Sequence, residues 1–260
     1  MRPVSRPQRS LSGRYDPGID EIIRFDAGAG LAIAAGTQVG RRYPANYDVL
    51  HADARLVVVA DGMGDGEGSA TAGRTAVDTV AAALAGVPVT PAALRAAVAE
   101  AQSRVRAAGR RLGLLTGCTL TAFVPGADSD AWLVQIGDSR AYRLRDGLLE
   151  LLTTDHTAAW LGAVNGWWPH DSPAAARARY QLHRYVGHPG DPEPDLLTVS
   201  LRPGDVYCLC TDGVSDQVPY HRLAERLATT DPRDAVAGIL ADTLAAGGHD
   251  NATVAVVGVS

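Results

Sequence analysis

The chain has 260 residues, of which 46% are hydrophobic and 20% charged, which is enough apolar material for a sizeable core. All 24 basic residues are Arg and 23 of the 29 acidic residues are Asp, and the formal net charge of −5 argues against a protein that coats nucleic acid. No stretch approaches the ~18 apolar residues that cross a bilayer, and the N-terminus lacks the apolar core of a signal peptide. We therefore expect a cytoplasmic globular protein without membrane or nucleic-acid partners.

The predicted elements begin after a solvated tail over residues 1–28 and continue as one domain over residues 29–260. Short runs rich in Val, Leu and Ala between turn residues predict strands, and long Ala-rich runs predict helices. In chain order these are strands over residues 31–37 and 55–60, helices over 69–84 and 91–112, strands over 118–124, 131–136, 141–145, 196–201 and 205–210, a helix from 231–232 to about residue 246, and a strand over 252–257.

The order of these elements indicates an α+β protein. Two long helices follow each other and the strands then succeed one another through tight turns, which is typical of antiparallel sheets. Thr90 before Pro91 and Asp231 before Pro232 are helix-start signals, because they combine a capping side chain with Pro at the first helical position. Residues 157–194 interrupt the pattern and contain three of the four Trp, and we expect a flap-like excursion over the surface there.

Four Asp residues, namely Asp61, Asp138, Asp212 and Asp250, lie at the ends of predicted strands, and the first three each have a Gly neighbour. A single Asp in such a place is explained by a turn or a helix cap. Carboxylates that converge from neighbouring strands repel one another unless a divalent cation lies between them. Mg²⁺ and Mn²⁺ prefer oxygen ligands, and a Gly lets its carbonyl approach an ion. The pattern therefore predicts a carboxylate metal site.

Eight motifs extend this pattern from about residue 29 to the C-terminus. They are Asn46-Tyr-Asp48, Val58-Val-Ala-Asp61-Gly-Met-Gly64, Thr116-Gly-Cys-Thr119-Leu-Thr121, Gly137-Asp138-Ser-Arg140-Ala-Tyr142, Leu152-Thr-Thr-Asp155-His156-Thr157, Pro203-Gly204-Asp205, Cys210-Thr-Asp212-Gly213-Val-Ser-Asp216 and Asp250-Asn251-Ala-Thr253. In this order they resemble the metal-dependent protein phosphatase family, protein phosphatase 2C type, in its bacterial form. The resemblance implies a four-layer αββα sandwich, in which two antiparallel sheets pack face to face with a helix pair outside each.

The resemblance also implies two Mn²⁺ or Mg²⁺ ions in a cleft at one sheet edge. By motif position, Asp61 would bridge the ions, the Gly62 carbonyl would bind one of them, and Asp212 and Asp250 would bind the other. Asp138 would match the ligand of a third, weaker ion of bacterial relatives. The implied activity is that of a protein-serine/threonine phosphatase, which hydrolyses phosphomonoesters with metal-activated water and forms no phosphoenzyme.

Residues around the ligands are implied in the same way. Asp48 and Asn251 would lie behind the ligands, where Asp48 would orient water. An Arg shortly before Asp48 would bind the substrate phosphate, and both Arg41 and Arg42 are available. We favour Arg42, although its spacing to Asp48 is about one residue longer than the family pattern. The implied partners are phosphoserine and phosphothreonine proteins, opposite a Ser/Thr kinase.

Two departures from the family pattern leave an alternative open. Tyr47 stands where the family has Glu, and Asp65-Gly66-Glu67-Gly68 replaces the usual Gly-Gly-His, so that no His closely follows Asp61 to protonate a leaving group. These changes would suit a pseudophosphatase that binds phosphoproteins without turnover. Every expected metal ligand is nevertheless present, which favours an enzyme. A phosphate carried by a small molecule or by a regulatory protein is a third option.

Overall fold

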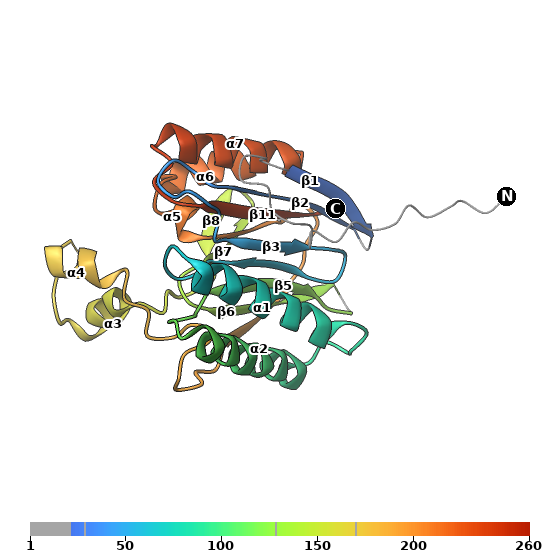
Figure 1. Ribbon diagram of the computed structural model, residues 1–260. Coiled ribbons are helices and arrows are strands. Elements are labelled where there is room, and N and C mark those ends of the chain that lie inside the picture. The colour runs from blue at the N-terminus through green and yellow to red at the C-terminus, as the bar shows by residue number, and fades with distance from the viewer. Residues whose placement is uncertain (1–21, 29, 128, 170) are drawn as a thin grey trace.

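The computed structural model describes residues 22–28, 30–127, 129–169 and 171–260. In these residues the strands form two antiparallel sheets (Figure 1). The first sheet has, in spatial order, β1 (Ile22–Gly28), β2 (Leu31–Gln38), β11 (Ala252–Val259), β10 (Val206–Cys210), β7 (Arg140–Arg145) and β8 (Leu148–Leu151). The second sheet has β3 (Val49–Ala52), β4 (Val57–Ala60), β5 (Leu120–Pro125), β6 (Asp130–Ile136) and β9 (Asp195–Ser200).

Helices cover the outer face of each sheet. The pair α1 (Glu67–Leu84) and α2 (Pro91–Leu112) packs on the second sheet, whereas α6 (Tyr220–Leu227) and α7 (Pro232–Ala245) pack on the first. A third apolar core fills the space between the two sheets. The predicted α+β fold and its four αββα layers are therefore confirmed (Figure 1).

The strand β4 shows how the sequence builds these layers. Its four residues are all fully buried, because helices lie on one side of the strand and the other sheet lies on the opposite side. Val57 and Val59 face the core between the sheets, whereas Val58 and Ala60 face α1 and α2. The period-two alternation of a strand thus appears here as a continuous apolar run.

The predicted elements are all present, and most of their ends agree within two residues. The helix α2 has the predicted bounds, and its cap is formed by Thr90, whose Oγ1 accepts a hydrogen bond from the backbone N–H of Ala93. The sequence did not predict β3, β8 or the helix α6, which are short. No helix in the described part of the chain has both the length and the apolar character that a bilayer crossing requires.

The predicted N-terminal tail over residues 1–28 differs from the structure at its C-terminal end. Residues 22–28 form β1 and pair with β2, with Phe25 opposite Ile33. Ile23 and Phe25 contact the core between the sheets, and this apolar alternation makes the segment an edge strand. Residues 1–21 lie outside the described residues.

Within the expected flap over residues 157–194, the part over residues 158–178 extends away from the sandwich (Figure 1), whereas Val186 is fully buried in the core and pairs with Cys118. The flap is more regular than predicted, because it contains two short helices that contact each other, α3 (Ala158–Asn165) and α4 (Pro173–Ala178). The ring of Trp168 packs so closely over Gly162 that an added Cβ would lie 2.4 Å from it, whereas Trp167 remains exposed. One Trp of the pair therefore packs inside the flap.

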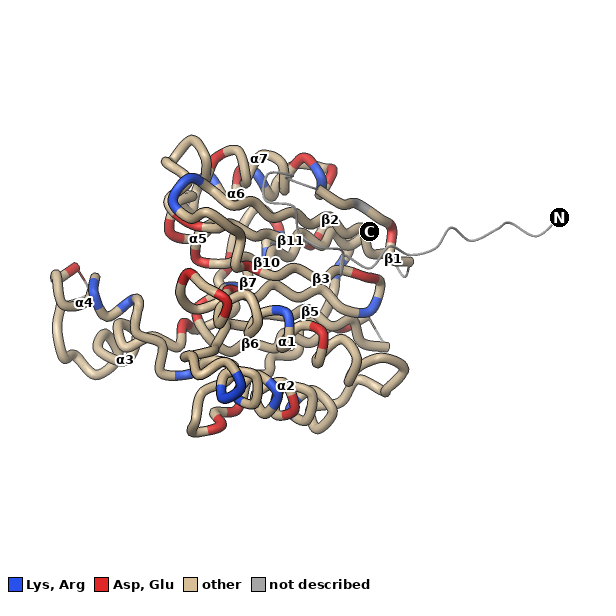
Figure 2. Tube along the Cα trace, in the orientation of Figure 1, with Lys and Arg blue, Asp and Glu red and all other residues tan. Residues whose placement is uncertain are grey.

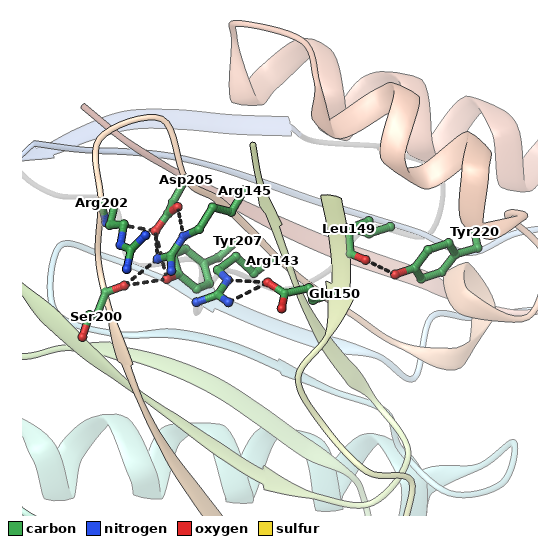
Figure 3. Close-up of polar contacts among 9 residues, drawn as sticks. All are labelled: Arg143, Arg145, Leu149, Glu150, Ser200, Arg202, Asp205, Tyr207 and Tyr220. Carbon is green, nitrogen blue, oxygen red and sulfur yellow. Dashed lines mark hydrogen bonds and ion pairs between the residues drawn. The ribbon is translucent and has the colours of Figure 1, made fainter. Parts of the chain in front are cut away.

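A buried ion pair joins β7 to the turn that precedes β10 (Figure 3). The guanidinium of Arg145 donates to both carboxylate oxygens of Asp205, at 2.7 and 2.6 Å. Asp205 is 1% exposed, and the Tyr207 hydroxyl also donates to it at 3.2 Å. These contacts fix the ends of β7 and β10 that lie away from Asp138 and Asp212.

Candidate active site

The four predicted carboxylates lie at one end of the sandwich. Asp61 follows β4, Asp138 lies between β6 and β7, Asp212 follows β10 at the start of the short helix α5 (Asp212–Ser215), and Asp250 precedes β11. All four line a single cleft, together with Gly62. Figure 2 shows acidic positions gathered at this end, around α5. The antiparallel strand order therefore brings together residues that are 189 positions apart in the case of Asp61 and Asp250.

The turn that carries Asp61 is held by backbone contacts. The backbone N–H of Asp61 donates to Oγ1 of Thr119 at 2.8 Å, and the Thr119 N–H donates back to the Asp61 carbonyl at 2.8 Å. At Gly62 an added Cβ would lie 2.6 Å from the Ser69 carbonyl oxygen and 2.9 Å from that of Tyr47. Only Gly fits there without displacing the backbone.

The carboxyl groups of the cleft perturb one another strongly. Burial and the neighbouring Asp48 and Asp212 raise the pKa of Asp61 well above its usual value. Burial raises the pKa of Asp212 to about 6, although this group shares a hydrogen bond with Asp61. Burial, followed by the charge of Asp212, also raises the pKa of Asp138, and burial raises that of Asp250. The cluster therefore retains protons at pH values where isolated carboxyl groups are ionised.

The donors of this cleft fit a divalent cation. Among the described residues, Oδ1 of Asp212 and Oδ1 of Asp48 are buried without a hydrogen-bond partner. Oxygen-only donors with concentrated negative charge suit Mg²⁺ or Mn²⁺. Within the same described residues, no three His, Cys, Asp or Glu side chains already form a group that could hold an ion. A bound cation would replace the proton that Asp61 and Asp212 share.

Asp48 is buried behind the cleft, and only one of its two carboxylate oxygens is hydrogen-bonded. Its Oδ2 accepts hydrogen bonds from Oγ1 of Thr211 at 2.8 Å and from Oγ1 of Thr253 at 2.7 Å. Burial raises the pKa of Asp48 to about 7, although these two bonds act in the opposite direction. The arrangement leaves Oδ1 buried without a hydrogen-bond partner, so it can still accept one.

Asn251 fastens the loop that carries the two candidate arginines. Its Nδ2 donates to the carbonyls of Val39 at 2.7 Å and Ala45 at 3.1 Å, and its Oδ1 accepts from the backbone N–H of Tyr47 at 2.7 Å. One side chain thus binds the loop at both ends. Asn251 also lines the cleft next to Asp250.

The two arginines have different surroundings. Arg42 is exposed, and its guanidinium lies 5.1 Å from the ring centre of Tyr43. Its positive charge lowers the pKa of Asp250, against the larger effect of burial. The backbone N–H of Arg41 donates to the carbonyl of Gly248 at 2.7 Å, and the Arg41 side chain begins against that Gly. Arg42 therefore contacts Tyr43, which lines the cleft, whereas neither Arg41 nor Arg42 is itself among the residues that line it.

His156 holds the turn in front of Asp138. Its Nδ1 accepts a hydrogen bond from the backbone N–H of Gly137 at 3.0 Å, so the neutral ring carries its proton on Nε2, which lies 3.1 Å from Oδ2 of Asp195. Burial lowers the pKa of His156, which keeps the ring neutral. The residue therefore shapes the loop and does not line the cleft.

Arg140 is not free to bind a second phosphate. Its Nε and Nη2 donate to the two oxygens of Asp155 at 2.9 and 2.6 Å, in a bidentate ion pair. Nearby, Arg179 of the flap pairs with Asp216, which follows α5. Both ion pairs line a small polar pocket that includes Asp138, and the pair between Arg179 and Asp216 connects the flap to the body.

Several residues that line the cleft were not predicted. They are Tyr43, Met63, Gly64, Thr119, Tyr180 and Leu182. Met63, Gly64 and Thr119 belong to the sequence motifs, which was a usable signal. Tyr180 and Leu182 come from the flap, and only the tertiary structure brings them to the carboxylates.

Comparison with known proteins agrees with this geometry. The sequence profile of the protein phosphatase 2C family matches residues 45–251. The serine/threonine protein phosphatase PstP of Mycobacterium tuberculosis is 35% identical over 238 residues, which are 88% of this chain and 45% of that protein. The chain thus spans about half the length of the curated PstP sequences that it matches.

Solved structures show the same fold. The crystal structure of PstP from Mycobacterium tuberculosis superimposes with a TM-score of 0.80 at 33% identity, over 88% of this chain and 99% of that one. The catalytic domain of PstP in complex with two manganese ions gives a TM-score of 0.78 at 34% identity, over 88% and 98% of the two chains. The chain belongs to the protein phosphatase 2C family, and the predicted family is confirmed. The relatives named above are bacterial serine/threonine phosphatases.

Proposed function

We propose that this chain is a metal-dependent phosphatase that hydrolyses phosphoserine and phosphothreonine in proteins. The observation that carries the proposal is the convergence of Asp61, Asp212 and Asp250 in one cleft with Arg42 beside it. In this proposal Asp61 and the Gly62 carbonyl would hold one Mn²⁺ or Mg²⁺ ion, and Asp61, Asp212 and Asp250 would hold a second. Asp138 would be a ligand of a third ion.

Bound ions would supply a water of lowered pKa as the nucleophile and would neutralise charge on the phosphoryl group. The remaining steps belong to the protein. Arg42 binds the phosphoryl oxygens through charge-assisted hydrogen bonds, and Asn251 holds the loop that presents it. Asp48 orients water through Oδ1, since Thr211 and Thr253 occupy Oδ2. In this proposal Arg41 does not bind phosphate, and it anchors the loop through the hydrogen bond from its backbone N–H to the Gly248 carbonyl.

The substrate class follows from family membership. The named relatives are serine/threonine phosphatases, and one solved relative holds two manganese ions. A phosphoprotein substrate requires a Ser/Thr kinase that produces it, so we propose such a kinase as the opposing activity. Tyr43 and the flap residue Tyr180 line the same cleft as the carboxylates, and we propose that they contact the phosphorylated segment of the substrate.

The proposal is tested with p-nitrophenyl phosphate and a phosphothreonine peptide in the presence of Mn²⁺. We expect hydrolysis that stops with a chelator and falls by about 10²-fold or more in Asp212→Asn, because that carboxylate is a proposed ligand. Asp78→Asn makes the same chemical change on the exposed face of α1 and should retain activity. Equal activity of Asp212→Asn and wild type would refute the metal assignment, and phosphopeptide binding without turnover at saturating Mn²⁺ would favour the pseudophosphatase.

A further inference from the structure

Tyr47 occupies the position before Asp48 at which the family pattern has Glu. The structure shows that its side chain makes two contacts. The hydroxyl donates a 2.7 Å hydrogen bond to the backbone carbonyl of Asp65, in the altered turn after Gly62. The ring packs edge-to-face on Tyr43, with ring centres 6.2 Å apart and planes at 79°.

Tyr43 in turn contacts Arg42, the candidate phosphate-binding residue. The Arg42 guanidinium lies 5.1 Å from the centre of the Tyr43 ring, within the range of a cation–π contact. The contacts therefore run without a gap from Arg42 through Tyr43 and Tyr47 to Asp65. We call these four residues the aromatic relay.

The backbone of Tyr47 is fixed independently of its side chain. Its N–H donates to Oδ1 of Asn251 at 2.7 Å, and its carbonyl lies against Gly62. The side chain therefore extends from an anchored backbone toward two exposed groups, the Arg42 side chain, which it reaches through Tyr43, and the turn at Asp65. A rigid aromatic ring with a polar tip is suited to hold both.

We propose that Tyr47 is a positioning residue that holds Arg42 beside the cleft through Tyr43, which lines it, and anchors the relay on the Asp65 carbonyl. This inference rests on the proposed function in one respect, namely that Arg42 binds the substrate phosphate. It accounts for both departures from the family pattern together, since Tyr47 and the altered turn contact each other. An exposed Arg pays a conformational cost when it binds phosphate, and prior ordering by Tyr43 reduces that cost.

The relay acts on phosphate binding rather than on metal binding. Tyr47 contacts a backbone carbonyl and an aromatic ring, so removing its hydroxyl changes no charge in the carboxylate cluster. The proposal therefore predicts an effect on KM and on phosphate affinity, with kcat and Mn²⁺ affinity preserved. A merely structural role would lower kcat, Mn²⁺ affinity and stability together.

The experiment compares Tyr47→Phe and Tyr43→Leu with wild type. Calorimetry measures the affinity of the Mn²⁺-loaded protein for inorganic phosphate and the affinity for Mn²⁺, and p-nitrophenyl phosphate gives KM and kcat. We expect phosphate affinity to fall and KM to rise about threefold in Tyr47→Phe and about tenfold in Tyr43→Leu, with kcat within about twofold. Tyr43→Phe keeps the ring and should lie closer to wild type than Tyr43→Leu.

Tyr220→Phe is the matched control. Its hydroxyl also donates to a backbone carbonyl, that of Leu149 on β8, and it lies outside the cleft (Figure 3). This variant should bind phosphate as wild type does. In an Arg42→Ala background, Tyr47→Phe should have no further effect on phosphate affinity, because the residue acts only through Arg42.

Three results would overturn the inference. The first is wild-type phosphate affinity in both Tyr47→Phe and Tyr43→Leu. The second is a loss in Tyr47→Phe that persists undiminished in the Arg42→Ala background, and the third is an Arg42→Ala variant that binds phosphate as well as wild type. Failure of the proposed function is a separate result, since a wild-type protein that binds phosphate through Arg42 but hydrolyses no substrate would refute the activity and retain the relay.

Discussion

Thr253 donates a 2.7 Å hydrogen bond to Oδ2 of Asp48, across 205 positions of the sequence. Thr211 donates to the same oxygen at 2.8 Å, so the turn before β3 is bonded to β10 and β11 of the other sheet. The bonds orient a carboxyl group that is otherwise surrounded by protein. Burial raises its pKa to about 7, and this gives the stability of the protein a defined dependence on pH.

Asp48→Asn should stabilise the metal-free protein at alkaline pH. A carboxyl group whose pKa is raised on folding contributes stability that is complete below its unfolded pKa and is lost as pH rises through the folded pKa of about 7. The neutral amide avoids this loss. From about pH 4.5 to pH 8, we therefore expect the free energy of unfolding of the variant, relative to that of wild type, to rise by on the order of 2 kcal/mol. Urea unfolding with chelator at both pH values measures the gain, and an equal difference at the two would contradict the assignment.

Removal of divalent metal should lower thermal stability more at pH 8 than at pH 5. Asp61 and Asp212 have raised pKa values, the latter about 6, so protons compete with metal at low pH. At about 100 times Kd, Mn²⁺ binding adds about 2.7 kcal/mol, or roughly 5–10 °C in Tm for a chain of this size. Differential scanning calorimetry with Mn²⁺ or chelator measures the shift. Asp212→Asn should lose most of it, and a shift that does not depend on pH would argue against these ligands.

Asp205→Asn should destabilise the protein without affecting the cleft. Burial alone would raise the pKa of Asp205, but its bonds to Arg145 and to the backbone of Arg202 hold the pKa below the usual value. The stability that this ion pair contributes is therefore present above the unfolded pKa and is lost as pH falls below about 4. Loss of one partner of a buried pair costs about 3–5 kcal/mol.

Chemical unfolding at neutral pH measures that loss, and KM for p-nitrophenyl phosphate should remain as in wild type. Glu100→Gln is the control, because it breaks the exposed pair between Glu100 and Arg104 on α2, for which a cost under about 1 kcal/mol is expected. Similar losses in the free energy of unfolding for the two variants would show that the buried pair contributes no more stability than the exposed pair.

Gly213→Ala should disrupt the base of the cleft. An added Cβ would lie 1.8 Å from the carbonyl oxygen of Asn251, which belongs to the backbone and cannot rotate away. We expect a loss of about 3 kcal/mol or more in the free energy of unfolding and reduced Mn²⁺ affinity, since Asp212 and Asp250 adjoin the clash. Gly66→Ala meets nothing within 4 Å and is the matched control. Wild-type stability in Gly213→Ala would contradict the packing described.

The sequence predicted the regular elements where local patterns were strong. The helix α2 was predicted within its bounds because Thr90 and Pro91 mark its start, and in the structure Gly113 ends it in the left-handed conformation. The strand β1 was missed because it is an edge strand whose alternation becomes evident only when β2 lies beside it. The flap helices were missed since they are short and bury few residues.

The sequence by itself determined which residues can supply the chemistry. The local sequence predicts four Asp residues at strand ends, namely Asp61, Asp138, Asp212 and Asp250, with Gly62 and Gly213 directly after two of them. These positions are predictable because strand ends and tight turns depend on neighbouring residues. Their convergence depends on the order of strands in two sheets, which local patterns do not specify. The contacts of Tyr47 were likewise decided by tertiary structure alone. The physical reason is that orientation of a loop side chain is set by the groups packed against it, and those groups come from distant parts of the chain.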